Sequence, residues 1–172
     1  MLKILIASDD TARLAEINRL ATIAGNFQTT SLQEGLARLP FQASRLRMAD
    51  LLVLDDMHLL SCSHDGTVRT WNCRTTWECE RVVQVGDCFM PMCLAAHKGM
   101  VYCGGNGRDP TIKVIDTATW TVVARMQGHS DFVRQLAVWE DKVVSCSSDN
   151  AIKVWRTGGD RACERTLRGH TE

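Results

Sequence analysis

Three aspartates lie where carboxylates could hold a metal ion. Asp9 and Asp10 follow the apolar run KILIAS, and Asp55 lies at the end of a second apolar run, ADLLVLDD. If both runs are strands of one parallel sheet, their ends gather hard oxygen ligands of the kind that Mg²⁺ requires. The structural alternative is that the first pair caps a helix and that Asp55 lies in a solvated turn.

Beyond these carboxylates, no set of side chains predicts catalysis. The five histidines are scattered along the chain and show no nucleophile-base-acid pattern. The eight cysteines include no paired C-x-x-C motifs, which a zinc site would need. We therefore predict that the protein is not an enzyme and has no catalytic residues. We predict no cofactor, except Mg²⁺ if the three aspartates form a site.

The strongest pattern in the chain is a repeat of about forty residues. The segment from Gly128 to Trp155 has a Gly-His pair, three short apolar runs separated by turn formers, and a terminal Trp. Its run AIKVW aligns with TIKVI and TVRTW upstream, and SCSSD aligns with SCSHD. Trp71, Ile115 and Trp155 then mark one position in three copies. This pattern predicts antiparallel meanders, each forming a propeller blade.

At these residues the chain resembles the WD40 family. The resemblance covers about residues 45–172, in three repeats at about 45–87, 88–128 and 129–170. The expected fold is therefore mainly β, with three WD40-like propeller blades preceded by an α/β segment at 1–44. The cysteines fit this repeat, because Cys62, Cys103 and Cys146 align with one another, as do Cys79 and Cys163. We interpret them as reduced packing residues.

The WD40 resemblance also implies a hydrogen-bonded chain within each complete blade. It would join the His of Gly-His, a strand hydroxyl, a turn Asp and the Trp indole. The first repeat keeps only Asp65 and Trp71, and the second has Asp87 and Ile115 in place of His and Trp, so we expect the second blade to be looser. The third repeat has the full set, with either serine as the hydroxyl: His129, Ser145, Ser147, Asp149 and Trp155.

The N-terminal residues follow a different pattern. KILIAS predicts a strand, 11–24 and 31–39 predict helices, and the β-α-β-α order favours an open parallel sheet. With ADLLVLDD as a further strand, residues 1–56 resemble the first half of a response-regulator receiver, which has a flavodoxin-like fold. The similarity is to the degenerate receivers of pilus-assembly and Tad-type localisation proteins. It implies Mg²⁺ at Asp9 and Asp10 and phosphorylation of Asp55.

Residues 49–56 fit both resemblances. MADLLVLDDMHLLSCSHD also aligns with FVRQLAVWEDKVVSCSSD of the third repeat, as the first two strands of a blade. One segment cannot serve both folds, and the continuity into His58, Leu59 and Leu60 favours the blade. A third interpretation is a fragment or a fusion of two pieces, with no complete function.

Composition narrows the class of partner. The formal net charge is zero, which predicts neither nucleic-acid nor anionic-membrane binding. The sequence has no apolar run long enough to span a membrane and its start is not a signal peptide, so we expect a cytoplasmic protein.

We predict a non-enzymatic scaffold that binds a protein or peptide partner through the exposed turns of its blades. Three blades leave two open edges, so a homodimer through these edges is also predicted. Trp139 is expected to pack within its blade. Arg and Trp are common in binding hot spots, and the candidates at the rim are Arg69, Trp77, Arg108, Trp120 and Arg156.

Overall fold

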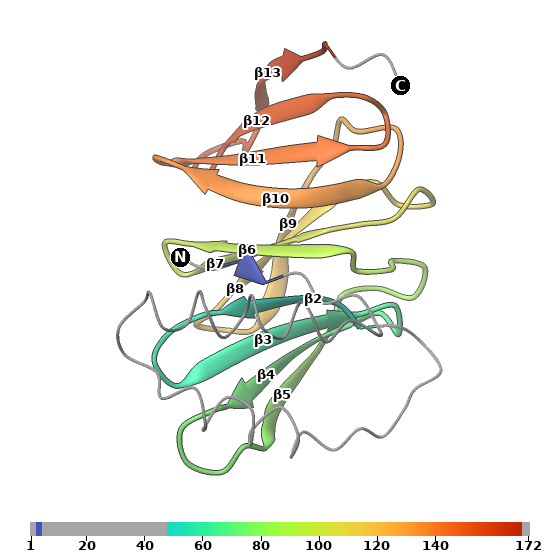
Figure 1. The fold of residues 1–172 in the computed structure, drawn as a ribbon. Helices are drawn as coiled ribbons and strands as arrows, with labels where there is room; N and C mark the ends of the chain where they lie inside the picture. The colour runs from blue at the N-terminus through green and yellow to red at the C-terminus, as the bar shows by residue number, and fades with distance from the viewer. Residues whose placement is uncertain (1–2, 5–47, 170–172) are drawn as a thin grey trace.

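A computed structural model describes residues 3–4 and 48–169 of the chain. These residues form thirteen strands in three sheets. Within the described residues, no helix is long and apolar enough to cross a membrane. Each sheet contains four consecutive strands in an antiparallel meander, and the three sheets stack one on the next (Figure 1). The predicted three-bladed β architecture is confirmed.

The strands follow the repeat closely. Each is five to seven residues long and begins or ends at the turn residues that the repeat contains. Blade one has β2 Met48–Val53, β3 His58–Ser63, β4 Thr67–Asn72 and β5 Cys79–Gln84. Blade two has β6 Cys93–His97, β7 Met100–Gly104, β8 Ile112–Asp116 and β9 Thr121–Met126. Blade three has β10 Val133–Trp139, β11 Lys142–Ser147, β12 Ile152–Arg156 and β13 Cys163–Leu167.

The remaining strand, β1 Lys3–Ile4, pairs antiparallel with β2, with Lys3 opposite Leu52. The prediction of a parallel sheet from these two runs is wrong. β2 is the first strand of blade one, because a short turn joins it to β3 and such a hairpin must be antiparallel. The predicted helices and both aspartates of the N-terminal pair lie outside the described residues.

The blades pack through their sheet faces. Since successive side chains in a strand point to opposite faces, each blade offers two apolar surfaces. One core lies between blades one and two and includes Leu60, Val68 and Ile115. A second core lies between blades two and three and includes Tyr102, Leu136 and Trp155. The blades thus meet through their sheet faces and not through their strand edges.

Blade two is buried on both faces. Its three inner strands are almost entirely inaccessible, and Ile115, at the position of the missing Trp, is fully buried. The expectation of a looser second blade does not match this burial. A blade with a neighbour on either side gains packing from both of them, which offsets the absence of its own polar chain.

One cysteine is offset from the predicted alignment. Cys62 and Cys146 lie opposite Val68 and Ile152, but Cys103 lies opposite Lys113, the register that Ser145 has in blade three. A shift of one residue moves a side chain to the other face of its sheet. Cys103 therefore points at blade one, where it meets Cys62, and burial together with this thiol contact raises the pKa of Cys62 well above its ordinary value.

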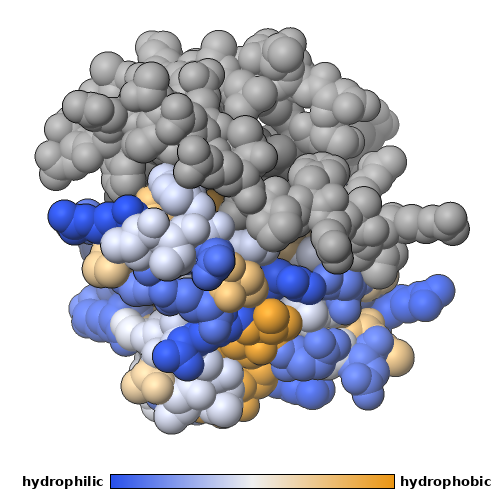
Figure 2. All heavy atoms as spheres, turned by 90° about the horizontal axis from the view of Figure 1, so that it is seen from below, coloured by the Kyte–Doolittle hydropathy of each residue, from blue (hydrophilic) through white to orange (hydrophobic). Residues whose placement is uncertain are grey.

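The outer side of blade one is mainly hydrophilic. Figure 2 views the molecule from the side on which β5 lies, and a small apolar patch is visible there among charged and polar side chains. Val82 on β5 is exposed. On β2, β3 and β4 of this blade, Leu51, Leu59 and Trp71 form a separate apolar cluster that is itself buried.

Gly104 permits the close approach of blades two and three. A Cβ on this residue would lie 2.6 Å from Cys93 Sγ and 2.7 Å from Val133 Cγ1. We predict that Gly104→Ala lowers the free energy of unfolding by about 1–3 kcal/mol, measured by urea denaturation. Gly158→Ala is the control, because no atom lies within 4 Å of its added Cβ. Equal stability of the two variants would contradict this account of the interface.

Candidate interaction site

A continuous polar chain lies inside blade three. His129 Nδ1 is 2.7 Å from Asp149 Oδ2, and His129 Nε2 is 2.7 Å from Ser145 Oγ. Trp155 Nε1 donates to the same serine oxygen at 2.8 Å. The order is therefore Asp149, His129, Ser145 and Trp155, and we call these four residues the blade-three clamp. Ser147 lies outside it and donates instead to the carbonyl of Asp131 at 2.8 Å.

The clamp holds a neutral histidine against an ionised aspartate. Burial lowers the pKa of His129, although the contact with Asp149 acts in the opposite direction. Burial alone would raise the pKa of Asp149, but the hydrogen bonds from His129 and from the Ser130 amide lower it below its ordinary value. Neutral His129 donates a hydrogen bond from Nδ1 to Asp149 and accepts one at Nε2 from the Ser145 hydroxyl. Every polar side-chain atom that links the four residues of the clamp then has a hydrogen-bond partner.

The turn aspartate is the element that all three blades share. Asp65 accepts from the amide and hydroxyl of Thr67 at 3.0 and 2.6 Å. Asp109 accepts from the hydroxyl of Thr111 at 2.7 Å, and Asp149 from the amide of Ala151 at 3.0 Å. Each carboxylate closes the turn between the second and third strands of its blade. The sequence alignment did not identify Asp109, because the turn around it is longer than the other two.

Blade one retains only one hydrogen bond of such a clamp, the bond between tryptophan and serine. Trp71 Nε1 donates to Ser61 Oγ at 2.8 Å, which is the equivalent of the bond between Trp155 and Ser145. Asp65 stays within its own turn and forms a weak ion pair with Arg69 at 3.6 Å.

Blade two has a buried lysine in place of the clamp. Lys113 Nζ donates to the Val85 carbonyl at 2.5 Å, lies 3.9 Å from the centre of the Phe89 ring, and is 3.5 Å from Asp109. Its side chain is almost fully buried, and this burial lowers its pKa although Asp109 opposes the shift. The chain makes room for it at Gly86, where φ is +136° and a Cβ would lie 2.6 Å from Nζ.

A buried carboxyl group also ties blade one to blade two. Asp50 is 2% exposed and accepts from its neighbour's amide, Leu51 N, at 3.0 Å and from Leu94 N of blade two at 2.8 Å. Sequence reasoning missed both Lys113 and Asp50, because each lies in a run of apolar residues and looks like an exposed position on a half-buried strand.

The turns lie on two opposite rims. The hairpin rim contains the turns from first to second and from third to fourth strands: 54–57, 73–78, 98–99, 117–120, 140–141 and 157–162. The crossover rim contains the remaining turns and the connections between blades: 64–66, 85–92, 105–111, 127–132 and 148–151.

The five predicted rim residues do not form one surface. Arg69 points to the crossover rim through its pair with Asp65, and Arg108 is exposed there without an ion pair to any described residue. The other three belong to the hairpin rim: Trp77, Trp120 and Arg156.

The candidates on the hairpin rim differ in how far contacts within the protein already engage their side chains. Arg156 is held by Asp160 at 2.8 Å, and Trp120 packs against the core between blades one and two with Arg81 over its ring. Trp77 is half-buried at a positive φ of 58°. The expectation that Trp139 packs inside its blade is wrong, since 58% of this residue is exposed at the end of β10.

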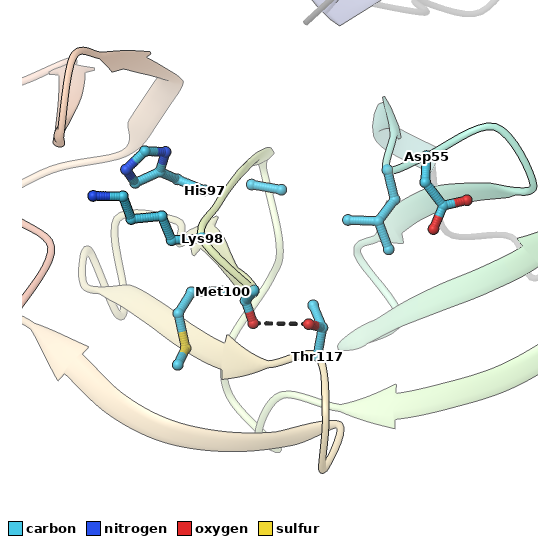
Figure 3. Close-up of a pocket in the computed structure, with 8 residues that line it drawn as sticks. Asp55, His97, Lys98, Met100 and Thr117 are labelled. Carbon is cyan, nitrogen blue, oxygen red and sulfur yellow. Dashed lines mark hydrogen bonds between the residues drawn. The ribbon is translucent and has the colours of Figure 1, made fainter.

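A pocket of about 320 Å³ lies on the hairpin rim between blades one and two. Figure 3 shows Asp55 on one side of it and His97 and Lys98 on the other, with Thr117 donating to the Gly99 carbonyl at 2.8 Å. Asp141 of blade three reaches Lys98 Nζ at 2.6 Å and His97 Nε2 at 3.3 Å.

Asp55 has a structural role in this rim. Its carboxylate accepts from the amides of Met57 and His58 at 2.8 Å each and contacts His58 Nδ1 at 2.9 Å. Burial alone would raise its pKa, but these bonds lower it below the ordinary value. Within residues 3–4 and 48–169, no three metal-ligating side chains gather in one place. The structure thus gives Asp55 the solvated-turn role.

Ser145 supplies the hydroxyl that completes the clamp. Ser145→Ala would leave His129 Nε2 and Trp155 Nε1 without partners, so we predict a loss of about 2–5 kcal/mol in the free energy of unfolding. Urea denaturation of purified protein measures it. Ser147→Ala is the matched control with an expected loss of about 1 kcal/mol, and a larger loss there than at Ser145 would contradict the assignment.

The clamp makes stability depend on pH. The native pKa of His129 lies below the ordinary value of 6.5, so on acidification the unfolded chain takes up this proton first. Stability is therefore full above pH 6.5 and falls below it, with a slope of up to about 1.4 kcal/mol per pH unit. Asp149 adds a further loss below its ordinary value of 3.8. Urea unfolding at several pH values should show a shallower slope between pH 7 and 5 in His129→Gln; an unchanged slope would refute the assignment.

Comparisons with known proteins agree with this geometry. A model of the family described as WD domain, G-beta repeat matches residues 52–72 and 120–156. The chain is 28% identical over 144 residues to the DENN domain and WD repeat-containing protein SCD1 of Arabidopsis thaliana, covering 83% of this chain and 11% of that protein. It is 33% identical over 131 residues to Elongator complex protein 2 of Danio rerio, covering 69% of this chain and 16% of that protein.

Solved structures show the same fold. A structure of U3-55K matches with a TM-score of 0.67 at 21% identity, over 76% of this chain and 42% of that one. The WD40 β-propeller domain of Doa1 matches with a TM-score of 0.63 at 23% identity, over 76% of this chain and 43% of that one. The chain thus spans less than half of each protein. Together with the family model, these matches support WD40 repeats, arranged as β-propeller blades, in the described part of the chain.

Proposed function

We propose that this chain is a protein-interaction scaffold, in which WD40-like blades present a rigid rim to a protein or peptide partner. The observation that carries the proposal is that buried Lys113 and His129 hold the crossover side of blades two and three, while Met57 and Trp139 are exposed at the hairpin rim. A scaffold that is fixed before binding loses little conformational entropy when a partner docks.

The relatives support the same class of function. WD40 propellers are in general non-enzymatic scaffolds, and Elongator complex protein 2 is by its name a component of a complex. The matched part is 11–16% of the length of the first three relatives, so their own partners are not assigned to this chain. Nothing in the structure or the comparisons favours a phosphorylated receiver, because Asp55 lies in a blade turn.

We place the partner site on the hairpin rim. Three tryptophans lie there, Trp77, Trp120 and Trp139, and buried aromatic anchors dominate most protein interfaces. The pocket between blades one and two lies on the same rim and could receive one partner side chain. On the crossover rim, Arg69 is engaged with Asp65, which leaves Arg108 as the exposed candidate. Self-association through open blade edges is a separate part of the proposal and stays a prediction.

The rim assignment is tested with two variants. A partner is first captured by chemical cross-linking to the full chain in cell extract and then purified, and its affinity is measured by calorimetry. Trp77→Asn keeps a residue that tolerates positive φ but removes the aromatic ring, so we predict a loss of affinity of tenfold or more. Arg108→Ala on the opposite rim is the control and should change affinity less than twofold.

If Arg108→Ala lowered the affinity tenfold while Trp77→Asn changed it less than twofold, the partner site would lie on the crossover rim. If no protein binds saturably to the folded chain, the scaffold function itself is refuted. Thermal unfolding of both variants confirms that any loss of affinity is not a loss of fold.

A further inference from the structure

The pocket on the hairpin rim, which we call the rim pocket, combines apolar and polar lining residues from two blades. Leu54 and Asp55 come from blade one, and the rest come from blade two. Leu54 and Ala96 belong to the core between blades one and two, and Met100 packs on the core between blades two and three. The apolar lining thus continues both cores. The volume of about 320 Å³ is at the small end of the range for ligand pockets and suits one side chain of a partner.

Two oxygen atoms of the lining can accept a further hydrogen bond. Asp55 Oδ1 accepts from the amides of Met57 and His58, whereas Oδ2 contacts only His58 Nδ1 among the described residues, at 2.9 Å. The hydroxyl of Thr117 donates its proton to the Gly99 carbonyl, so the lone pairs of its oxygen remain. Both oxygens act as acceptors, and a matching ligand must therefore be a donor.

The blade-one side of the rim pocket is negatively charged. Burial alone would raise the pKa of Asp55, but the hydrogen bonds from His58 and the Met57 amide lower it, so this carboxylate is ionised at neutral pH. His58 lies between two carboxylates, since its Nε2 is 3.3 Å from Glu80 Oε2. Even a charged His58 therefore leaves one negative charge in excess.

The basic groups on the blade-two side are engaged elsewhere. Lys98 Nζ is 2.6 Å and His97 Nε2 is 3.3 Å from Asp141 Oδ1 of blade three. Figure 3 shows both basic side chains across the pocket from Asp55. Asp141 thus neutralises Lys98, and the carboxylate of Asp55 keeps its charge for a ligand.

The charge around the rim pocket has the same sign. Four stretches line the pocket or contact its lining residues: 54–57, 97–100, 116–120 and 140–141. They contain one lysine and five carboxylates, which are Asp55, Asp56, Asp116, Glu140 and Asp141. Arg81 is held over the ring of Trp120 and does not line the pocket. This excess of carboxylates attracts a cation and repels an anion.

We propose that the rim pocket binds a lysine or arginine side chain of a partner peptide, an assignment that rests on the scaffold function proposed above. Such a side chain has an apolar stem and a head that carries only donors. The stem packs on Leu54, Ala96 and Met100. The head donates to Asp55, with Thr117 as a second acceptor. An apolar side chain would instead desolvate the carboxylate without replacing the lost water.

Nuclear magnetic resonance titration of the isotope-labelled full chain tests the assignment without a partner. The probes are the N-acetyl methylamides of lysine, arginine, norleucine and glutamate. We expect the two cationic probes to shift the amide signals of 54–57 and 97–100 saturably, with a dissociation constant on the order of 1 mM. Norleucine should bind about tenfold more weakly, because it lacks the charge-assisted hydrogen bond. No saturable shift with the cationic probes, equal binding of norleucine, or tighter binding of glutamate would each overturn the proposal.

Three variants separate the pocket carboxylate from the general charge of the rim. Asp55→Asn keeps an acceptor for the amides of Met57 and His58 but removes the charge, so the cationic probes should bind about tenfold more weakly. Asp56→Asn is the matched control, because it makes the same charge change beside the pocket lining, and should alter binding less than about twofold. Lys98→Met removes a competing cation and should tighten binding. An equal loss in both asparagine variants, or weaker binding in Lys98→Met, would contradict the assignment.

Failure of this assignment is distinguishable from failure of the scaffold function. If a captured protein partner binds the folded chain and Asp55→Asn leaves its affinity unchanged, the scaffold function stands and the pocket assignment is refuted. If the cationic probes bind as expected but no protein binds saturably, the cation preference of the rim pocket stands and the scaffold function is refuted. Thermal unfolding of each variant shows that its fold is retained, and the comparison of probes on the wild-type chain needs no variant.

Discussion

The alternation of side chains along a strand is the constraint on which this structure depends. It gives every blade two faces, and the repeat makes both of them apolar. A single sheet of this kind cannot bury its own surface, so each blade needs a neighbour. Blade two, with a neighbour on either side, is buried on both faces, and Ile115 there is fully buried at the position that a tryptophan has in the other two blades. Packing between sheets, rather than hydrogen bonding at strand edges, thus assembles the molecule.

The polar interior varies more than the apolar one. Blade three uses an uncharged histidine and a serine, blade one uses only a serine and a tryptophan, and blade two uses a lysine. In blades two and three the polar group also holds the segment that enters the blade, at Val85 and at His129, whereas blade one keeps only the bond within its sheet. What they share is the turn aspartate. A buried lysine is costly to desolvate, and here a carbonyl, an aromatic ring and a carboxylate together compensate for the lost water.

The sequence predicts the strands and blades well, because turn formers and β-branched runs are local signals that recur in each copy. The resemblance to the WD40 family, rather than a local signal, predicts the complete clamp, apart from the choice between Ser145 and Ser147, which depends on which face each side chain occupies. Cys103, Lys113 and Asp50 could not be placed from sequence. Their burial depends on contacts between blades and on a one-residue offset in register, neither of which changes the local pattern.

The resemblance to a receiver shows a different limit. An apolar strand that ends in aspartates is compatible with both a parallel sheet and a blade, and only the pairing partner distinguishes them. The antiparallel register of β2 with β1 and β3 assigns it to the blade. Asp55 then closes a hairpin, although its place after the apolar run is the same in both folds.

The two rims should respond differently to ionic strength. The Lys98–Asp141 pair that links the turns of blades two and three is largely exposed, and at 1 M salt the Debye length is only about 3 Å, so this link weakens. The ammonium of Lys113 lies in the interior and is shielded from mobile ions. Concentrated salt would thus loosen the contact between these two hairpin turns while the Lys113 contact on the crossover rim stays fixed, and the scaffold would bind through a more adaptable hairpin rim.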